Sequence, residues 1–138
     1  MEFVSNVVVS RCYLRHIILW AAGQNMTGTL PVEVAYLPFL QSLSLQYNDF
    51  SGSIPVEYAR MRYLINLDVH SNQLSGSIPN DIYEIPNDIY ENDILAEQIN
   101  SGENHLTGTI STLIGEWTPL KGLHVDHHRL EGSIPEDI

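Results

Sequence analysis

A glycine recurs along this chain at a fixed interval, and this recurrence limits the possible folds more than any other feature. Gly28, Gly52 and Gly76 are spaced by 24 residues, and Gly108 and Gly132 are again 24 residues apart. Each of these glycines follows Met, Leu or Phe by two residues and precedes Ile or Leu by two residues. A fixed period of this length predicts a solenoid, in which each repeat packs mainly against its neighbours.

Each glycine belongs to a longer pattern that is clearest in the third copy. That copy runs Leu64-x-x-Leu67-x-Val69-x-x-Asn72-x-Leu74-x-Gly76-x-Ile78-Pro79. Leu67 and Val69 alternate with polar residues, which indicates a strand with one buried face. One copy cannot bury its apolar face alone, so neighbouring copies must bury it for each other. The pattern therefore predicts a stacked parallel sheet with about 4.8 Å between neighbouring strands.

An asparagine follows the predicted strand in three of the copies, as Asn48, Asn72 and Asn104. The chain turns inward there, and a buried turn leaves backbone groups without partners, which is costly. A carboxamide can both donate to such groups and accept from them, so stacked asparagines are expected to form a ladder. Gln24 and His128 take this position in the first and fifth copies. Both retain hydrogen-bonding groups, so the ladder is predicted to be altered at its two ends.

These residues resemble the leucine-rich repeat family, and within it the plant-type class, whose unit reads L-x-x-L-x-L-x-x-N-x-L-[ST]-G-x-I-P. The resemblance covers roughly residues 16–138. It implies an α/β fold, a leucine-rich repeat solenoid shaped as a horseshoe arc, with a parallel β-sheet on the concave face and 3-10 or irregular turns on the convex face. We expect residues 1–138 to form a single array of about five repeats, with residues 1–15 as an irregular N-terminal flank. Within that flank, residues 7–9 either add an edge strand or cover the first repeat.

The regular spacing is interrupted between Gly76 and Gly108, which are 32 residues apart. Most of the excess is a tandem duplication, because the segment IPNDIYE occurs twice in succession from Ile78 onward. We place this insertion at residues 80–95 on the convex side, where solenoids tolerate loops. Two interpretations stay open for it: a short helix over about residues 87–97, or an acidic loop.

The strand positions that the apolar pattern leaves free define the concave face, and one row across it is predicted to hold Trp20, Ser44, Asp68, Asn100 and His124. The resemblance implies that this face binds a protein or peptide, in a module of a larger receptor-like or inhibitor-like protein. The alternative is a structural fragment of a longer repeat array without binding function of its own. Trp20 and Tyr47 are the expected contact anchors, because aromatic residues dominate interface hot spots. The candidate ligand-binding residues are Trp20, Ser44, Gln46, Tyr47, Asp68, His70, Ser71, Asn100, Glu103, His124, Asp126 and His127.

The resemblance also implies an extracellular or cell-surface location. The sequence shows neither a clear signal peptide nor the paired cysteines that usually end such ectodomains, since Cys12 is its single cysteine. A net charge of −11 with only six lysines and arginines argues against nucleic acid as a partner. The N-terminal apolar stretches are too interrupted for a membrane span, so we expect no direct membrane insertion.

Two sharper chemical interpretations are less favourable. His124, Asp126 and His127 carry the donor atoms of a metal site, but His127 leaves the strand on which the other two share a face. His70 and Asp68 could be combined with Ser44 or Ser71 as a catalytic group, yet an open curved sheet excludes water poorly. We therefore predict no metal, no cofactor and no enzymatic activity.

Overall fold

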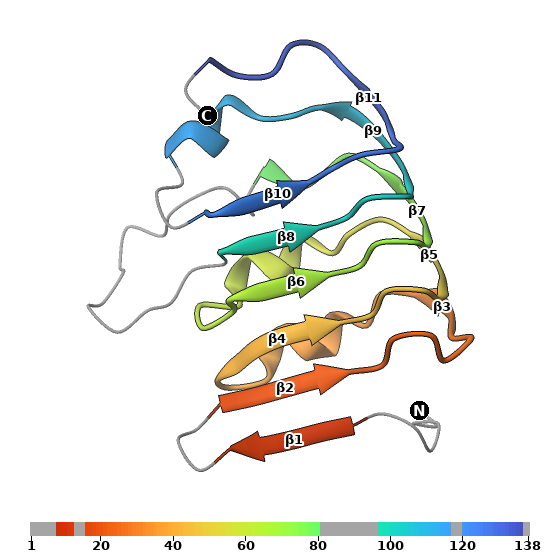
Figure 1. Cartoon of the computed structure of the whole chain (residues 1–138), viewed down its shortest axis with the longest axis vertical. Coiled ribbons are helices and arrows are strands. Elements are labelled where there is room, and N and C mark those ends of the chain that lie inside the picture. Colours follow the sequence, from red (N-terminus) through yellow and green to blue (C-terminus); the bar gives the residue numbers. More distant parts are fainter. Residues whose placement is uncertain (1–7, 13–15, 81–96, 117–119, 137–138) are drawn as a thin grey trace.

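The structure is a computed structural model that describes residues 8–12, 16–80, 97–116 and 120–136. These residues form a stack of coils in which one strand of a large sheet recurs in every coil (Figure 1). The predicted solenoid is thus confirmed. The expected insertion at residues 80–95 lies outside the described residues except for its first position.

The larger sheet has six strands in the order β1-β2-β4-β6-β8-β10 and forms the concave face of the arc. All neighbouring strands from β2 onward are parallel. Its strands are β1 (Val8–Cys12), β2 (His16–Trp20), β4 (Leu40–Ser44), β6 (Asn66–Asp68), β8 (Gln98–Asn100) and β10 (Gly122–His124). We call the repeats rungs 1 to 5 and number them by β2, β4, β6, β8 and β10.

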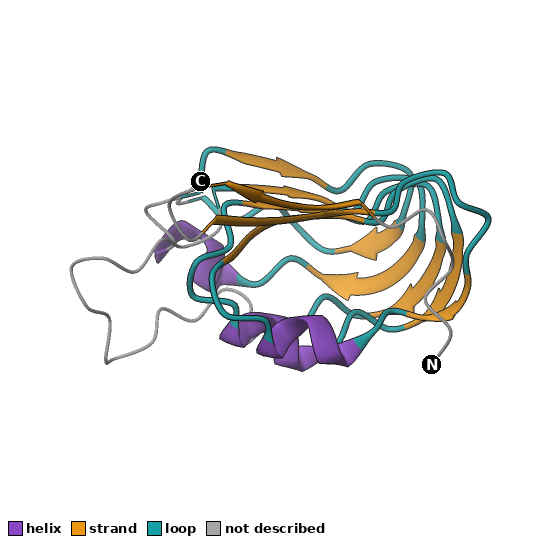
Figure 2. Ribbon diagram, turned by 90° about the horizontal axis from the view of Figure 1, so that it is seen from below, coloured by secondary structure: helices purple, strands orange, loops and turns teal. Residues whose placement is uncertain are grey.

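A second sheet of five parallel strands closes one side of each coil, in the order β11-β9-β7-β5-β3. Its strands are β3 (Thr27–Thr29), β5 (Asp49–Gly52), β7 (Gln73–Gly76), β9 (His105–Thr109) and β11 (Arg129–Glu131). Short 3-10 helices cover the convex side, opposite the six-stranded sheet (Figure 2). They are η1 (Val32–Tyr36), η2 (Val56–Arg60) and η4 (Thr112–Glu116). No helix in the described part is long and apolar enough to cross a membrane.

The first coil is closed by a strand that does not follow the repeat. Strand β1 runs antiparallel to β2, with Val8 paired to Trp20 and Cys12 paired to His16. Of the two alternatives for the N-terminal flank, the edge strand is therefore the one found. Figure 1 shows β1 pointing against the direction of every other strand in the sheet.

The register of the larger sheet is unchanged across the irregular spacing. Ser44 pairs with Asp68, and Asp68 pairs with Asn100, so the sheet continues in phase through rungs 3 and 4. The surface of the larger sheet therefore stays continuous from rung 2 to rung 4.

The core lies between the two sheets and the 3-10 helices. Leu43, Leu67 and Leu106 are almost fully buried there, as the alternation predicts. Rung 5 is less well covered, because Leu123 and Leu130 are only partly buried and Ile134 is 73% exposed. Apolar burial per rung therefore decreases toward the C-terminal end of the described chain.

The predicted asparagine ladder is present, and each member connects two rungs. Asn72 is buried; its Oδ1 accepts the Phe50 N–H at 3.0 Å. Its Nδ2 donates to the carbonyls of Leu45 at 3.1 Å and Val69 at 3.0 Å. Leu45 and Phe50 belong to rung 2, so one side chain satisfies turn groups of two rungs.

Asn48 and Asn104 repeat this arrangement in their own rungs. The Oδ1 of Asn104 accepts the Leu74 N–H at 2.9 Å, and its Nδ2 donates to the Val69 carbonyl at 3.0 Å. The Oδ1 of Asn48 accepts the N–H groups of Gln24 and Met26. The ladder therefore ties rungs 1 to 4 together through buried polar contacts that no apolar side chain can replace.

The two ends of the ladder differ from its interior. The Gln24 amide donates to the Ala22 carbonyl of its own rung at 2.9 Å. His128 is half-buried, and neither of its ring nitrogens has a hydrogen-bond partner among the described residues. Burial lowers the pKa of His128 below its usual value of 6.5.

We predict that Asn72→Ala lowers the free energy of unfolding by about 3 kcal/mol or more, because several buried backbone groups lose their partner together. The measurement is urea unfolding followed by circular dichroism. Asn66→Ala is the matched control, since the Asn66 amide makes only a long contact of 3.5 Å to the Ser42 hydroxyl. A similar loss in both variants would contradict the role given to the ladder.

We predict that His128→Asn raises the free energy of unfolding by about 1 kcal/mol, because an amide can restore the ladder contacts in rung 5. The gain should widen on acidification. A histidine with a lowered folded pKa contributes full stability above the unfolded value of 6.5 and loses it as pH falls through that value toward the folded pKa. Urea unfolding of both proteins at neutral and mildly acidic pH measures this; a constant difference would disprove the pH linkage.

Candidate functional site

Outward-facing residues of the six-stranded sheet form rows that cross the rungs. The register aligns Trp20 with Ser44, and continues the same row to Asp68, Asn100 and His124. These five residues were predicted to share a row, and they do. Figure 1 shows the five strands that carry them lying side by side.

Backbone hydrogen bonds extend the sheet beyond the strand ends and place the remaining candidates beside this row. The Tyr47 N–H donates to the His70 carbonyl at 3.1 Å, and the Ser71 N–H donates to the Gly102 carbonyl at 3.0 Å. The Glu103 N–H donates to the Asp126 carbonyl at 3.0 Å. Gln46, His70 and Asp126 thus follow one row, and Tyr47, Ser71, Glu103 and His127 follow the next.

The side chains of the middle rungs contact one another across the face. The Nδ1 atom of His70 lies 2.5 Å from Oδ1 of Asp68. A carboxylate only accepts hydrogen bonds, so Nδ1 carries the proton and Nε2 is left as the free acceptor of the neutral ring. The Tyr47 ring meets the His70 ring edge-on at 4.6 Å between centroids. These contacts fix the orientation of His70.

Rungs 4 and 5 present two further carboxylates. The Ser71 hydroxyl donates to Oε2 of Glu103 at 2.5 Å. The Nδ1 of His127 lies 2.6 Å from Oδ2 of Asp126, and this bond lowers the pKa of Asp126 and raises that of His127. The absence of a side chain at Gly102 makes room for Asp126, because a Cβ there would lie 2.5 Å from its Oδ1.

One row of this face, the row that contains Tyr47, has an unusual backbone conformation. Tyr47, Ser71, Glu103 and His127 all adopt left-handed φ angles between 50° and 57°, and only rung 1 has a glycine, Gly23, at this position. Side chains other than Asn and Asp enter this region at a cost of order 1 kcal/mol. Four rungs therefore carry side chains where glycine would relieve strain.

The accessible surface is distributed unevenly among the candidates. Tyr47 is 62% exposed and Trp20 is 43% exposed, whereas Ser44 is only 8% exposed. Ser44 therefore offers little surface to a partner. The Ser71 hydroxyl bonds Glu103 and not His70, so these serines do not complete a catalytic group with Asp68 and His70. No three His, Cys, Asp or Glu side chains in the described ranges are placed to hold a metal ion.

A second surface, on the five-stranded sheet, was missed by our sequence analysis. Hydroxyl residues flank the recurring glycine on both sides in four rungs, and all of them are exposed. The signal is present in the sequence as a repeated [ST]-G-[ST] around the recurring glycine. We call these residues the hydroxyl ladder: Thr27, Thr29, Ser51, Ser53, Ser75, Ser77, Thr107 and Thr109.

The members of the hydroxyl ladder stand close to the next rung. Thr29 pairs with Ser51 in the sheet, and the Ser51 hydroxyl donates to the Gly28 carbonyl at 3.3 Å. A Cβ added to Gly52 would lie 3.2 Å from the Thr29 methyl group. Glycine at this position, with its φ of 79°, therefore lets the hydroxyl side chains of successive rungs approach closely.

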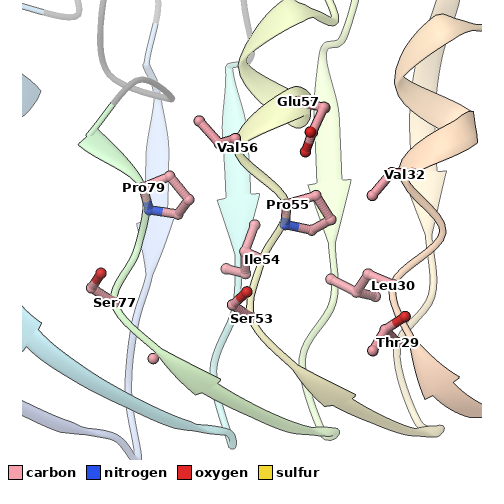
Figure 3. Close-up of a pocket in the computed structure, with 11 residues that line it drawn as sticks. Thr29, Leu30, Val32, Ser53, Ile54, Pro55, Val56, Glu57, Ser77 and Pro79 are labelled. Carbon is pink, nitrogen blue, oxygen red and sulfur yellow. The ribbon is translucent and has the colours of Figure 1, made fainter.

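An open groove of about 610 Å³ borders the hydroxyl ladder on the convex side. Figure 3 shows Thr29, Ser53 and Ser77 along one rim and Pro55 and Pro79 behind them. Its apolar wall includes the exposed side chains of Val32 and Val56. The chain thus has two separate surfaces with regular spacing: a mixed polar and aromatic concave face, and an edge lined with hydroxyls.

Known proteins share this architecture. A family model described as Leucine Rich Repeat matches residues 39–61 and 63–85. Three solved plant structures are similar to the chain. A chain of the BIR3–SERK2 complex from Arabidopsis thaliana is 29% identical, with a TM-score of 0.81 over 97% of this chain and 68% of its own length. The peptide hormone receptor RGFR1, in complex with RGF2, is 33% identical, with a TM-score of 0.71 over 81% of this chain.

A plant ice-binding protein is also similar, at 28% identity and a TM-score of 0.76 over 87% of this chain. This chain covers only 17% of the RGFR1 chain and 36% of the ice-binding protein. No curated protein sequence matches the chain.

Proposed function

Because this chain belongs to the leucine-rich repeat family, with repeats of the plant type, we propose that its concave face binds a protein or peptide partner. The similar structures support a binding module, since one is a complex of two proteins and another holds a peptide hormone. The observation that carries the proposal is the exposure of Trp20 and Tyr47 on the concave face.

The two aromatic residues are suited to act as anchors. Exposed tryptophan and tyrosine lose little conformational entropy on binding and bury a large area, which is why they dominate interface hot spots. Tyr47 rests edge-on against His70, and the Asp68 carboxylate holds that ring in place. The anchor is thus partly organised before a partner arrives, which reduces the cost of binding.

The test uses random peptides selected against the whole chain. We predict that Trp20→Ala combined with Tyr47→Asn raises the dissociation constants of the selected peptides roughly tenfold or more. Asparagine tolerates the left-handed conformation, so the second change removes the ring and leaves the backbone unstrained. Fluorescence anisotropy gives the constants.

Tyr36→Ala is the matched control, because Tyr36 is 63% exposed but lies on η1 on the convex side. It should leave the dissociation constants unchanged. If Tyr36→Ala weakened peptide binding as much as the double variant, binding could not be assigned to the concave face. A failure to select any peptide would favour the structural alternative, in which the repeats only extend a longer array.

The hydroxyl ladder supports a second candidate function on the other sheet: we propose that it binds ice. Each hydroxyl can donate and accept a hydrogen bond, and a pair of exposed hydroxyls recurs in each of four successive rungs. Water bound to these hydroxyls would take up positions that repeat from rung to rung, which is what contact with a crystal of water requires. The similarity to a plant ice-binding protein supports this proposal.

We predict that the wild-type chain slows the growth of ice crystals in frozen sucrose solution and that Ser77→Arg removes most of this effect. Ser77 lies in the third of the four rungs of the hydroxyl ladder, and a long charged side chain there would interrupt the series of hydroxyls. Thr112→Arg is the control, because Thr112 is exposed on η4 outside the ladder. Crystal growth equal to that in buffer, or equal effects of the two variants, would refute the proposal.

A further inference from the structure

The concave face changes in chemical character from one end of the arc to the other. Ile18 and Trp20 of rung 1 are each 43% exposed, and Tyr47 follows on rung 2. Carboxylates replace these groups farther along: Asp68 on rung 3 and Glu103 on rung 4. Asp126 adds a third carboxylate on rung 5. One half of the face is therefore apolar and aromatic, and the other half is acidic.

Each of the three carboxylates is oriented by a hydrogen bond from a neighbouring histidine or serine side chain. Asp68 is bonded to His70, Glu103 to Ser71, and Asp126 to His127. None of the outward positions of the five rungs holds lysine or arginine in the described part of the chain. Apart from the histidines, no side chain at these positions in the described residues offsets the three negative charges.

A partner that covers this half of the face must supply the missing positive charge, because burying uncompensated carboxylates is costly. Arginine suits the arrangement best, since its planar guanidinium carries five donors and can bridge neighbouring carboxylates. Lysine supplies the same charge with less directional bonding. The apolar half of the face favours an apolar or aromatic side chain, because burying apolar surface on binding is favourable.

The spacing of the rungs sets the distance between these two requirements. Trp20 and Asp68 are two strands apart in one row, which corresponds to about 10 Å, and Asp126 lies two further strands along, at about 19 Å. An extended peptide advances about 3.3 Å per residue. The two side chains must therefore be separated by roughly three to six residues.

We infer that the concave face recognises an extended peptide segment with an apolar side chain over rung 1 and an arginine or lysine, roughly three to six residues away, over rungs 3 to 5. The inference rests on the proposed function of this face and specifies its partner. The partner must therefore present its apolar and its basic side chain in the same order as the apolar and acidic halves of the concave face.

The experiment uses fluorescein-labelled peptides on a Gly/Ser background at about pH 8, where histidine is neutral. One set carries leucine and arginine at increasing separations, and a matched set carries leucine and glutamate. We expect the arginine peptides to bind at least about fivefold more tightly, with the optimum at the stated separation and with weakening as salt rises. The variant Asp68→Asn/Glu103→Gln/Asp126→Asn should abolish the preference for arginine and retain the contribution of leucine.

The control variant Glu33→Gln/Glu57→Gln/Glu136→Gln removes three carboxylates from other surfaces and should keep the preference for arginine. Circular dichroism confirms that both variants are folded. Equal binding of the two peptide sets, still weakened by Trp20→Ala, would overturn this inference and leave the proposed function standing. Binding that Trp20→Ala with Tyr47→Asn does not change, or no binding of either set, would overturn both.

Discussion

The hydrogen bonds of the buried asparagines are the constraint on which the rest of this structure depends. Every coil turns inward after its strand, and that turn places backbone N–H and C=O groups where water cannot reach them. Asn48, Asn72 and Asn104 satisfy these groups in their own rung and in the preceding one. Apolar packing between rungs adds stability, but it cannot by itself pay for unpaired backbone groups.

The same scaffold leaves two sets of positions free, and their patterns differ. On the concave face the free positions carry different side chains in each rung, which suits a partner whose own groups follow a particular order. On the five-stranded sheet the free positions carry hydroxyls in rung after rung, which suits a target that is itself periodic. The left-handed conformations of Tyr47 and Glu103 show that side chains are kept on the concave face at an energetic cost.

Much of the fold was predictable because the solenoid is nearly one-dimensional. Leu67, Asn72 and Gly76 each have a role that depends on neighbours at one fixed spacing, so the period alone reveals it. The row from Trp20 to His124 was predicted correctly for the same reason. The candidate site was less accessible to prediction. Ser44 lies in the predicted row yet is buried. The ring nitrogens of His128 lack hydrogen-bond partners because of the residues that surround them, which its position in the repeat does not reveal.

The sequence by itself determined the period, the strands, the ladder positions and the identity of the outward-facing residues. These properties follow from spacing, because each repeat meets an almost identical neighbour. Only the tertiary structure decided which outward side chains contact each other, as with His70 on Asp68 and Asp126 over Gly102. It also showed that hydroxyls on either side of the glycine are all exposed on one sheet. Such contacts depend on rotamers, backbone twist and the closeness of adjacent rungs, which a one-dimensional pattern does not specify.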